Sequence, residues 1–211
     1  MGEGSHKISQ MLGSNVRGCN RINDMAILKI ARMGHPVLAQ VAQPVANPAA
    51  PEIRRLVSDM IETMIDANGA GLAAPQVHVP LRVVVFQAPE GRSDPEFAER
   101  FDHTAPLTVL INPEIEVMSS EIEGGWEGCL SVPGLRGFVE RPFHIRYRGF
   151  DVDGREVART AKGFHARVVQ HECDHLDGKV YLDRMTSMET LSFVREYQRY
   201  WLAPDEEDDG E

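Results

Sequence analysis

The spacing of hydrophobic residues predicts an amphipathic helix over residues 51–68. Its apolar residues recur three and four positions apart, which places their side chains on one face of a helix. They are Ile53, Leu56, Val57, Met60, Ile61 and Met64. Pro51 suits the first turn, where its missing N–H would have no partner, and Gly69 favours the end of the helix.

Shorter hydrophobic runs after this helix are typical of strands. Residues 81–88, 107–111, 143–151 and 155–160 carry such runs, and Asp153-Gly154 between the last two favours a turn. The chain from 81 to 160 is therefore expected to form strands, the last two of them joined as a hairpin.

Two helices are expected in the last quarter of the chain. The first covers about residues 163–176, with Phe164, Val168 and Val169 among its apolar residues. The second is indicated by Thr186-Ser187-Met188-Glu189, the spacing of a capping box, followed by an apolar series. Because the strands precede these helices instead of alternating with them, the order favours an α+β fold over a wound parallel sheet.

Length and composition fit one domain with a tail at each end. The chain has 211 residues, of which 42% are hydrophobic and 26% charged, enough to bury one sizeable core. We expect a single domain over residues 25–203, a disordered leader, tag or presequence over residues 1–24, and a disordered acidic tail over residues 204–211. With a net charge of −10, the chain is not expected to bind nucleic acid stably.

Cysteine use and hydropathy indicate the compartment. Three widely spaced cysteines do not form a disulfide framework, which favours a reducing compartment. The sequence has no apolar run long enough for a membrane span, and residues 1–24 lack the apolar core of a secretory signal. We therefore expect no membrane association and a bacterial cytoplasmic location, with an organelle matrix as the alternative.

The strongest chemical signal is the segment from His171 to His175. Residues four apart share a face of a helix, so these two histidines can bind one metal ion with Glu172 beside it, near an activated water. No histidine follows His175, so a third ligand must come from elsewhere in the chain. The best candidate is Cys129, for which a ligand and a small buried residue are equally supported at this point. Cys173 lies on another side of the helix and is expected in the core.

Three segments taken together resemble the peptide deformylase family. They are Gly69-Ala70-Gly71-Leu72-Ala73-Ala74-Pro75-Gln76, Glu127-Gly128-Cys129-Leu130-Ser131, and Gln170 through Leu176. They match the family motifs in order and in approximate spacing, and the resemblance runs from about Met25 to about Met185. It implies a catalytic domain in which antiparallel sheets pack around a central helix that carries the two histidines, with a further helix at the C terminus.

The resemblance also implies a chemical role for each motif residue. The metal ligands would be Cys129, His171 and His175. They would bind one divalent ion, Fe²⁺ by family precedent, although Zn²⁺, Ni²⁺ or Co²⁺ suit the same donors. Glu172 would transfer protons, and the Gln76 side-chain amide and the Leu130 backbone N–H would stabilise an oxyanion.

Further residues would contact the substrate. The resemblance places Gly69, Ala70, Gly71 and Gly128 along the substrate backbone. It places Phe164 and Val168 at a pocket sized for methionine. It also suggests that Arg136 steadies Glu127 or the substrate, and that Asp174 orients a histidine.

The function that the resemblance implies is removal of the N-formyl group from the initiator methionine of nascent polypeptides, with release of formate. N-formylmethionyl peptides would be the partners, and ribosome contact is expected to be transient because the tail is acidic. Two alternatives are a zinc endopeptidase, which would need neither Cys129 nor Gln76, and a metal-dependent binding module, which would tolerate loss of Glu172.

Overall fold

The computed structural model describes residues 26–88 and 105–202, so the predicted leader and acidic tail lie outside the described residues. Two antiparallel sheets make up most of the fold. The larger has the order β1-β2-β3-β6-β7, and its strands are β1 (Gly71–Ala73), β2 (Val83–Ala88), β3 (Ala105–Val117), β6 (His144–Phe150) and β7 (Glu156–Lys162). The smaller has the order β4-β5-β8, and its strands are β4 (Ile122–Cys129), β5 (Val132–Pro142) and β8 (Ser192–Phe193).

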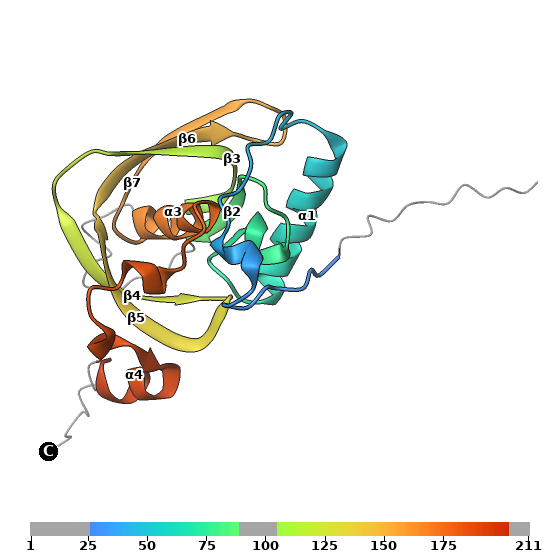
Figure 1. Cartoon of the computed structure of the whole chain (residues 1–211). Coiled ribbons are helices and arrows are strands. Elements are labelled where there is room, and N and C mark those ends of the chain that lie inside the picture. Colours follow the sequence, from blue (N-terminus) through green and yellow to red (C-terminus); the bar gives the residue numbers. More distant parts are fainter. Residues whose placement is uncertain (1–25, 89–104, 203–211) are drawn as a thin grey trace, which may run out of the picture.

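Helix α3 (Gly163–Leu176) lies between the larger sheet and the hairpin formed by β4 and β5 (Figure 1). Its buried residues Ala166, Val169 and Leu176 pack in one apolar cluster with residues of the sheet that include Val84 and Phe86. The predicted α+β fold with a central helix is therefore confirmed, and α3 has the bounds expected from the sequence.

Helix α1 (Pro51–Asp66) covers the other side of β2 (Figure 1). Met60 and Met64 pack in a second apolar cluster with Val83 and Val85. Successive side chains of a strand point to opposite faces, so the unbroken apolar run of β2 reflects burial on both faces. The helix ends two residues before the predicted position, at Asp66, because Asn68 adopts a left-handed φ of 53°.

The hairpin of β4 and β5 contains a glycine-rich segment that nevertheless forms a strand. Gly124, Gly125 and Gly128 all lie within β4, and Cys129 is its last residue. The glycines leave room for other side chains: a Cβ at Gly128 would lie 2.6 Å from Nη1 of Arg136. Glycine therefore serves close packing on both faces of this strand.

The segment after Ser187 also differs from the predicted continuous helix. The Ser187 hydroxyl accepts a hydrogen bond from Glu189 N at 3.1 Å, but it caps only a short 3₁₀ turn, η4 (Met188–Thr190). The chain then pairs with β5 as β8, and helix α4 (Val194–Tyr200) begins only afterwards. Pairing with a neighbouring strand has overridden the local helix signal. No helix in the described part of the chain is long and apolar enough to cross a membrane.

Candidate metal and active site

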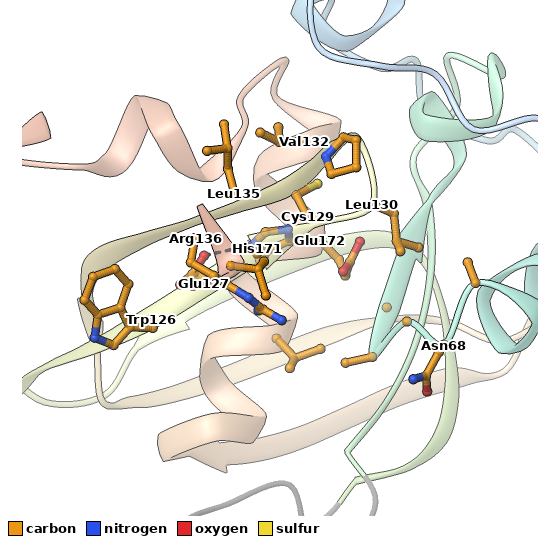
Figure 2. Close-up of a pocket in the computed structure, with 18 of the residues that line it drawn as sticks. Asn68, Trp126, Glu127, Cys129, Leu130, Val132, Leu135, Arg136, His171 and Glu172 are labelled. Carbon is orange, nitrogen blue, oxygen red and sulfur yellow. Dashed lines mark hydrogen bonds and ion pairs between the residues drawn. The ribbon is translucent and has the colours of Figure 1, made fainter. Parts of the chain in front are cut away.

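Two structural elements bring together three side chains that could bind a metal ion. Cys129 ends β4, while His171 and His175 lie one turn apart on the face of α3 that looks toward the hairpin. One ligand atom from each of the three residues lies within 4.8 Å of the other two, and Cys129 Sγ is 3.3 Å from His175 Nε2. Figure 2 shows Cys129 and His171 in the wall of a shared pocket. The cluster is therefore able to hold a metal ion.

Glu127 fixes the orientation of one of these histidines. His171 Nδ1 lies 2.8 Å from Glu127 Oε2, and because a carboxylate only accepts, the ring nitrogen donates. This contact leaves Nε2 of His171 for the cluster, an arrangement common where imidazole binds metal. Glu127 and Cys129 each contact a histidine of α3, although the pairing of β4 with β5 shifts register between them. The regular two-residue period of a strand could therefore not have identified the role of Glu127 from the sequence.

Arg141 holds Glu127 in turn. Its Nε donates to Glu127 Oε1 at 2.6 Å and its Nη2 donates to Oε2 at 2.9 Å, and both side chains are buried. Burial raises the pKa of Glu127, but the hydrogen bonds from Arg141 and His171 outweigh it and hold the pKa far below its ordinary value. Glu127 is therefore a permanent carboxylate in this structure.

Two sequence-based interpretations are corrected here. Arg141 and Arg167, not Arg136, bind Glu127. Arg136 lies over Gly128 and lines the pocket, so its alternative role at the substrate stays a prediction. Asp174 does not orient a histidine but binds Arg141 at 2.9 Å and Arg184 at the far side of α3. Partners that depend on the pairing of separate strands cannot be read from the spacing within one motif.

The electrostatics of the cluster favour a thiolate. Burial raises the pKa of Cys129, but His175 and His171 outweigh it and hold the pKa well below its ordinary value. Burial lowers the pKa of His171, and its contacts with Cys129 and Glu127 raise the pKa well above its ordinary value. An anionic sulfur facing two imidazoles is a set of donors that suits a transition metal.

Glu172 lies beside the cluster in a nearly closed environment. Burial raises its pKa to about 7, opposed by the neighbouring His171 and His175. Its buried Oε2 has no hydrogen-bond partner among the described residues, while a Cβ at Gly71 would overlap its Oε1. The backbone of β1 thus approaches this carboxylate at a position where only glycine fits, and one carboxylate oxygen remains free for chemistry.

Gln76 faces the same cluster from the short helix η2 (Ala74–Val77). Its side chain is buried, its Oε1 accepts from Ala73 N at 2.8 Å, and its Nε2 lies 3.4 Å from Cys129 Sγ and 3.2 Å from Ser131 Oγ. Gln76 is therefore part of the interior and not a surface residue. Because the oxygen is held by the backbone, the amide N–H groups point toward the cluster.

A cavity of about 610 Å³ opens onto these residues. All the residues predicted to contact substrate line it: Gly69, Ala70, Gly71, Gly128, Phe164 and Val168. Leu130, at the turn of the hairpin, also lines it (Figure 2). Among the lining residues that the sequence interpretation missed are Trp126, Arg167 and two residues of α4, Val194 and Tyr197.

Cys173 is separate from this site. It is buried in the apolar cluster that α3 shares with the larger sheet, and burial raises the pKa of its thiol. Its predicted place in the core is confirmed.

Comparison with known proteins gives the same family as the motifs. The model of the polypeptide deformylase family matches residues 27–191. The chain is 50% identical over 165 residues to peptide deformylase 1 of Bordetella pertussis, an alignment that covers 78% of this chain and 91% of the relative. It is 49% identical over 168 residues to peptide deformylase 2 of Ralstonia nicotianae, covering 80% and 92%.

Solved structures agree in fold. A class I type b peptide deformylase from Acinetobacter baumannii with Met-Ala-Ser bound matches with a TM-score of 0.67 and 36% identity, covering 76% of this chain and 99% of that one. Peptide deformylase from Ehrlichia chaffeensis matches with a TM-score of 0.69 and 36% identity, covering 78% and 91%. With these matches, and with a cluster of possible metal ligands at its centre, the chain belongs to the polypeptide deformylase family.

Proposed function

We propose that Cys129, His171 and His175 bind one divalent metal ion, with which this enzyme removes the N-formyl group from the initiator methionine of nascent polypeptides. The observation that carries the proposal is the convergence of a thiolate, two imidazoles and the Glu172 carboxylate at one cavity. Sulfur and nitrogen donors suit Fe²⁺, Zn²⁺, Ni²⁺ and Co²⁺, and we propose Fe²⁺ on the precedent of the family.

The donor set fits such an ion without rearrangement of its partners. The Glu127 carboxylate accepts the hydrogen bond from Nδ1 of His171, and the histidines lower the pKa of the Cys129 thiol, which favours the anionic form that binds metal. When bound, the ion supplies Lewis acidity, which lowers the pKa of a water molecule and polarises the formyl carbonyl.

Glu172 is proposed as the proton carrier. Its buried carboxylate, with a pKa raised to about 7, takes a proton as water attacks the formyl carbon. The bond between the formyl carbon and the amide nitrogen then breaks, and Glu172 returns the proton to that nitrogen. The products are formate and a free N-terminal amine.

Gln76 and Leu130 are proposed to stabilise the negative oxygen that forms during attack. Preorganised donors are effective at such a position because they need not reorient during the reaction. The amide of Gln76 is held by Ala73 N, and the backbone N–H of Leu130 follows directly after Cys129.

The substrate would lie between the hairpin and the segment before β1. The methionine side chain is proposed to contact Phe164 and Val168, and the substrate backbone to run along Gly69, Ala70, Gly71 and Gly128. The Met-Ala-Ser complex of the Acinetobacter baumannii relative supports a peptide occupant.

We further propose that residues 25–203 form one catalytic domain. We propose that the protein contacts the ribosome only transiently and binds neither nucleic acid nor membranes stably. Its proposed location is the bacterial cytoplasm, with an organelle matrix as the alternative.

Release of formate tests this proposal. The protein, purified without air and analysed for metal, is given formyl-Met-Ala-Ser, acetyl-Met-Ala-Ser and an internally blocked longer peptide. We expect formate from the first peptide alone. Cleavage within the longer peptide would instead indicate an endopeptidase, and metal-loaded protein without any turnover would indicate a binding module.

A further inference from the structure

We propose that Arg167 is a positioning residue, which holds the β4–β5 hairpin against α3 so that Cys129 stays at binding distance from the two histidines. This inference rests on the proposed function, because it concerns the same metal ligands. It assigns a role to a side chain that takes no part in the chemistry described above.

Arg167 extends from α3 to both strands of the hairpin. Its Nη2 donates to Glu123 O at 2.7 Å, and its Nη1 donates to Val139 O at 2.8 Å, to Glu127 Oε1 at 2.9 Å and to Gly125 O at 3.5 Å. The side chain is only 8% exposed. Acceptors on two strands thus share one guanidinium, whose planar fork of donors suits several fixed acceptors better than a flexible ammonium does.

Gly125 makes the space for this guanidinium. A Cβ built at Gly125 would lie 2.9 Å from Cζ of Arg167 and 3.0 Å from its Nε, too close for the present contacts. The strand backbone and the guanidinium therefore lie in direct contact. A larger residue at 125 would push Arg167 away from the acceptors on the hairpin.

The ligands need such a contact because they come from two separate elements. Cys129 belongs to β4, and the histidines belong to α3. The small apolar cluster under the hairpin, formed by Val132, Val139 and Tyr181, is distinct from the cluster that contains the buried face of α3. Polar contacts therefore contribute strongly to holding hairpin and helix together.

Arg141 and Arg167 make different contacts between the hairpin and α3. Arg141 belongs to the hairpin itself and binds Glu127 through two hydrogen bonds, so Glu127 keeps an ionic partner when Arg167 is removed. Arg141 also joins the hairpin to Asp174 of α3, and what Arg167 adds are hydrogen bonds from α3 to backbone carbonyls of both strands of the hairpin. Its loss should therefore loosen the ligand geometry without leaving an unpaired carboxylate in the interior.

The test compares Arg167→Met, Arg167→Lys and a stability control, Ile145→Val, a buried position of β6 in the cluster of α3. For each protein the Co²⁺ dissociation constant is measured by competition with a chelator, together with the visible spectrum of the Co²⁺ form, the Tm, and kcat and KM for formyl-Met-Ala-Ser. We expect Arg167→Met to weaken Co²⁺ binding by about 10- to 100-fold and to change the spectrum, as loss of a group supporting metal ligands does. Ile145→Val should lower Tm but leave Co²⁺ binding unchanged.

The conservative variant and a second perturbation separate positioning from simple destabilisation. Arg167→Lys should restore only part of the affinity, because an ammonium cannot reach the acceptors of both strands at once. Gly125→Ala should weaken Co²⁺ binding with Arg167 still present. If Arg167→Met does not fold, the Co²⁺ affinity of Gly125→Ala tests the positioning role of Arg167 in its place. Unchanged Co²⁺ affinity and spectrum in Arg167→Met or in Gly125→Ala overturn the proposal. A wild-type protein that binds Co²⁺ but releases no formate would defeat the proposed function, while the affinity comparison would still test Arg167.

Discussion

Replacing Glu127 by glutamine isolates the contribution of one buried charge. The carboxylate accepts four hydrogen bonds, two from Arg141, one from Arg167 and one from His171. Glutamine keeps the shape, but its NH₂ group would face two of these donors, and the two buried arginines would lose their shared anion. Removing one partner of a buried ion pair costs about 3–5 kcal/mol. For a protein of this size that corresponds to a fall in Tm of roughly 6–20 °C.

The assay separates folding from metal binding. Thermal unfolding is measured on chelator-treated protein, so that loss of metal does not contribute, and metal affinity is measured separately. Glu123→Gln is the matched control, because Glu123 lies on the same face of β4 but is partly exposed and 3.9 Å from Arg167. We expect a change within about 1 kcal/mol for this control. Equal Tm values for the Glu127 and Glu123 variants would refute the reasoning.

Three further substitutions test the chemistry of the site. Glu172→Gln should retain the metal but lower formate release by about 10²- to 10⁴-fold, since it removes the proton carrier, and normal turnover would contradict that role. Gln76→Leu should reduce kcat by about 10²- to 10³-fold with a smaller change in KM, and steady-state kinetics with an unaltered kcat would exclude it from the oxyanion site. Cys129→Ser should lose metal, because a hydroxyl is a poor substitute for a thiolate. Cys173→Ser should keep both metal and activity. If metal analysis gives the reverse result, the proposed ligand set is wrong.

Helices whose apolar residues recur at the regular helical spacing were predictable from the sequence. The bounds of α3 and the shared face of His171 and His175 follow from helical spacing alone. The family resemblance favoured the ligand role of Cys129, which the residues alone had left open, and it added Gln76. The β4–β5 hairpin was not predictable, because glycines at 124, 125 and 128 weaken the strand signal that their close packing actually serves. Arg141 was missed as the partner of Glu127 because that contact depends on how the two strands of the hairpin pair.

The mode of attachment of the hairpin has a consequence for how the enzyme loses activity. Sheet and α3 share one continuous apolar cluster, while the hairpin is joined to them largely by hydrogen bonds and ion pairs. Segments with fewer apolar contacts to the main core open at lower free energy than the core itself. An opening of the hairpin alone would carry Cys129 away from the histidines and leave the rest folded. Rising urea should therefore abolish formate release before it abolishes the amide exchange protection of α3, giving a species that is inactive yet mostly native.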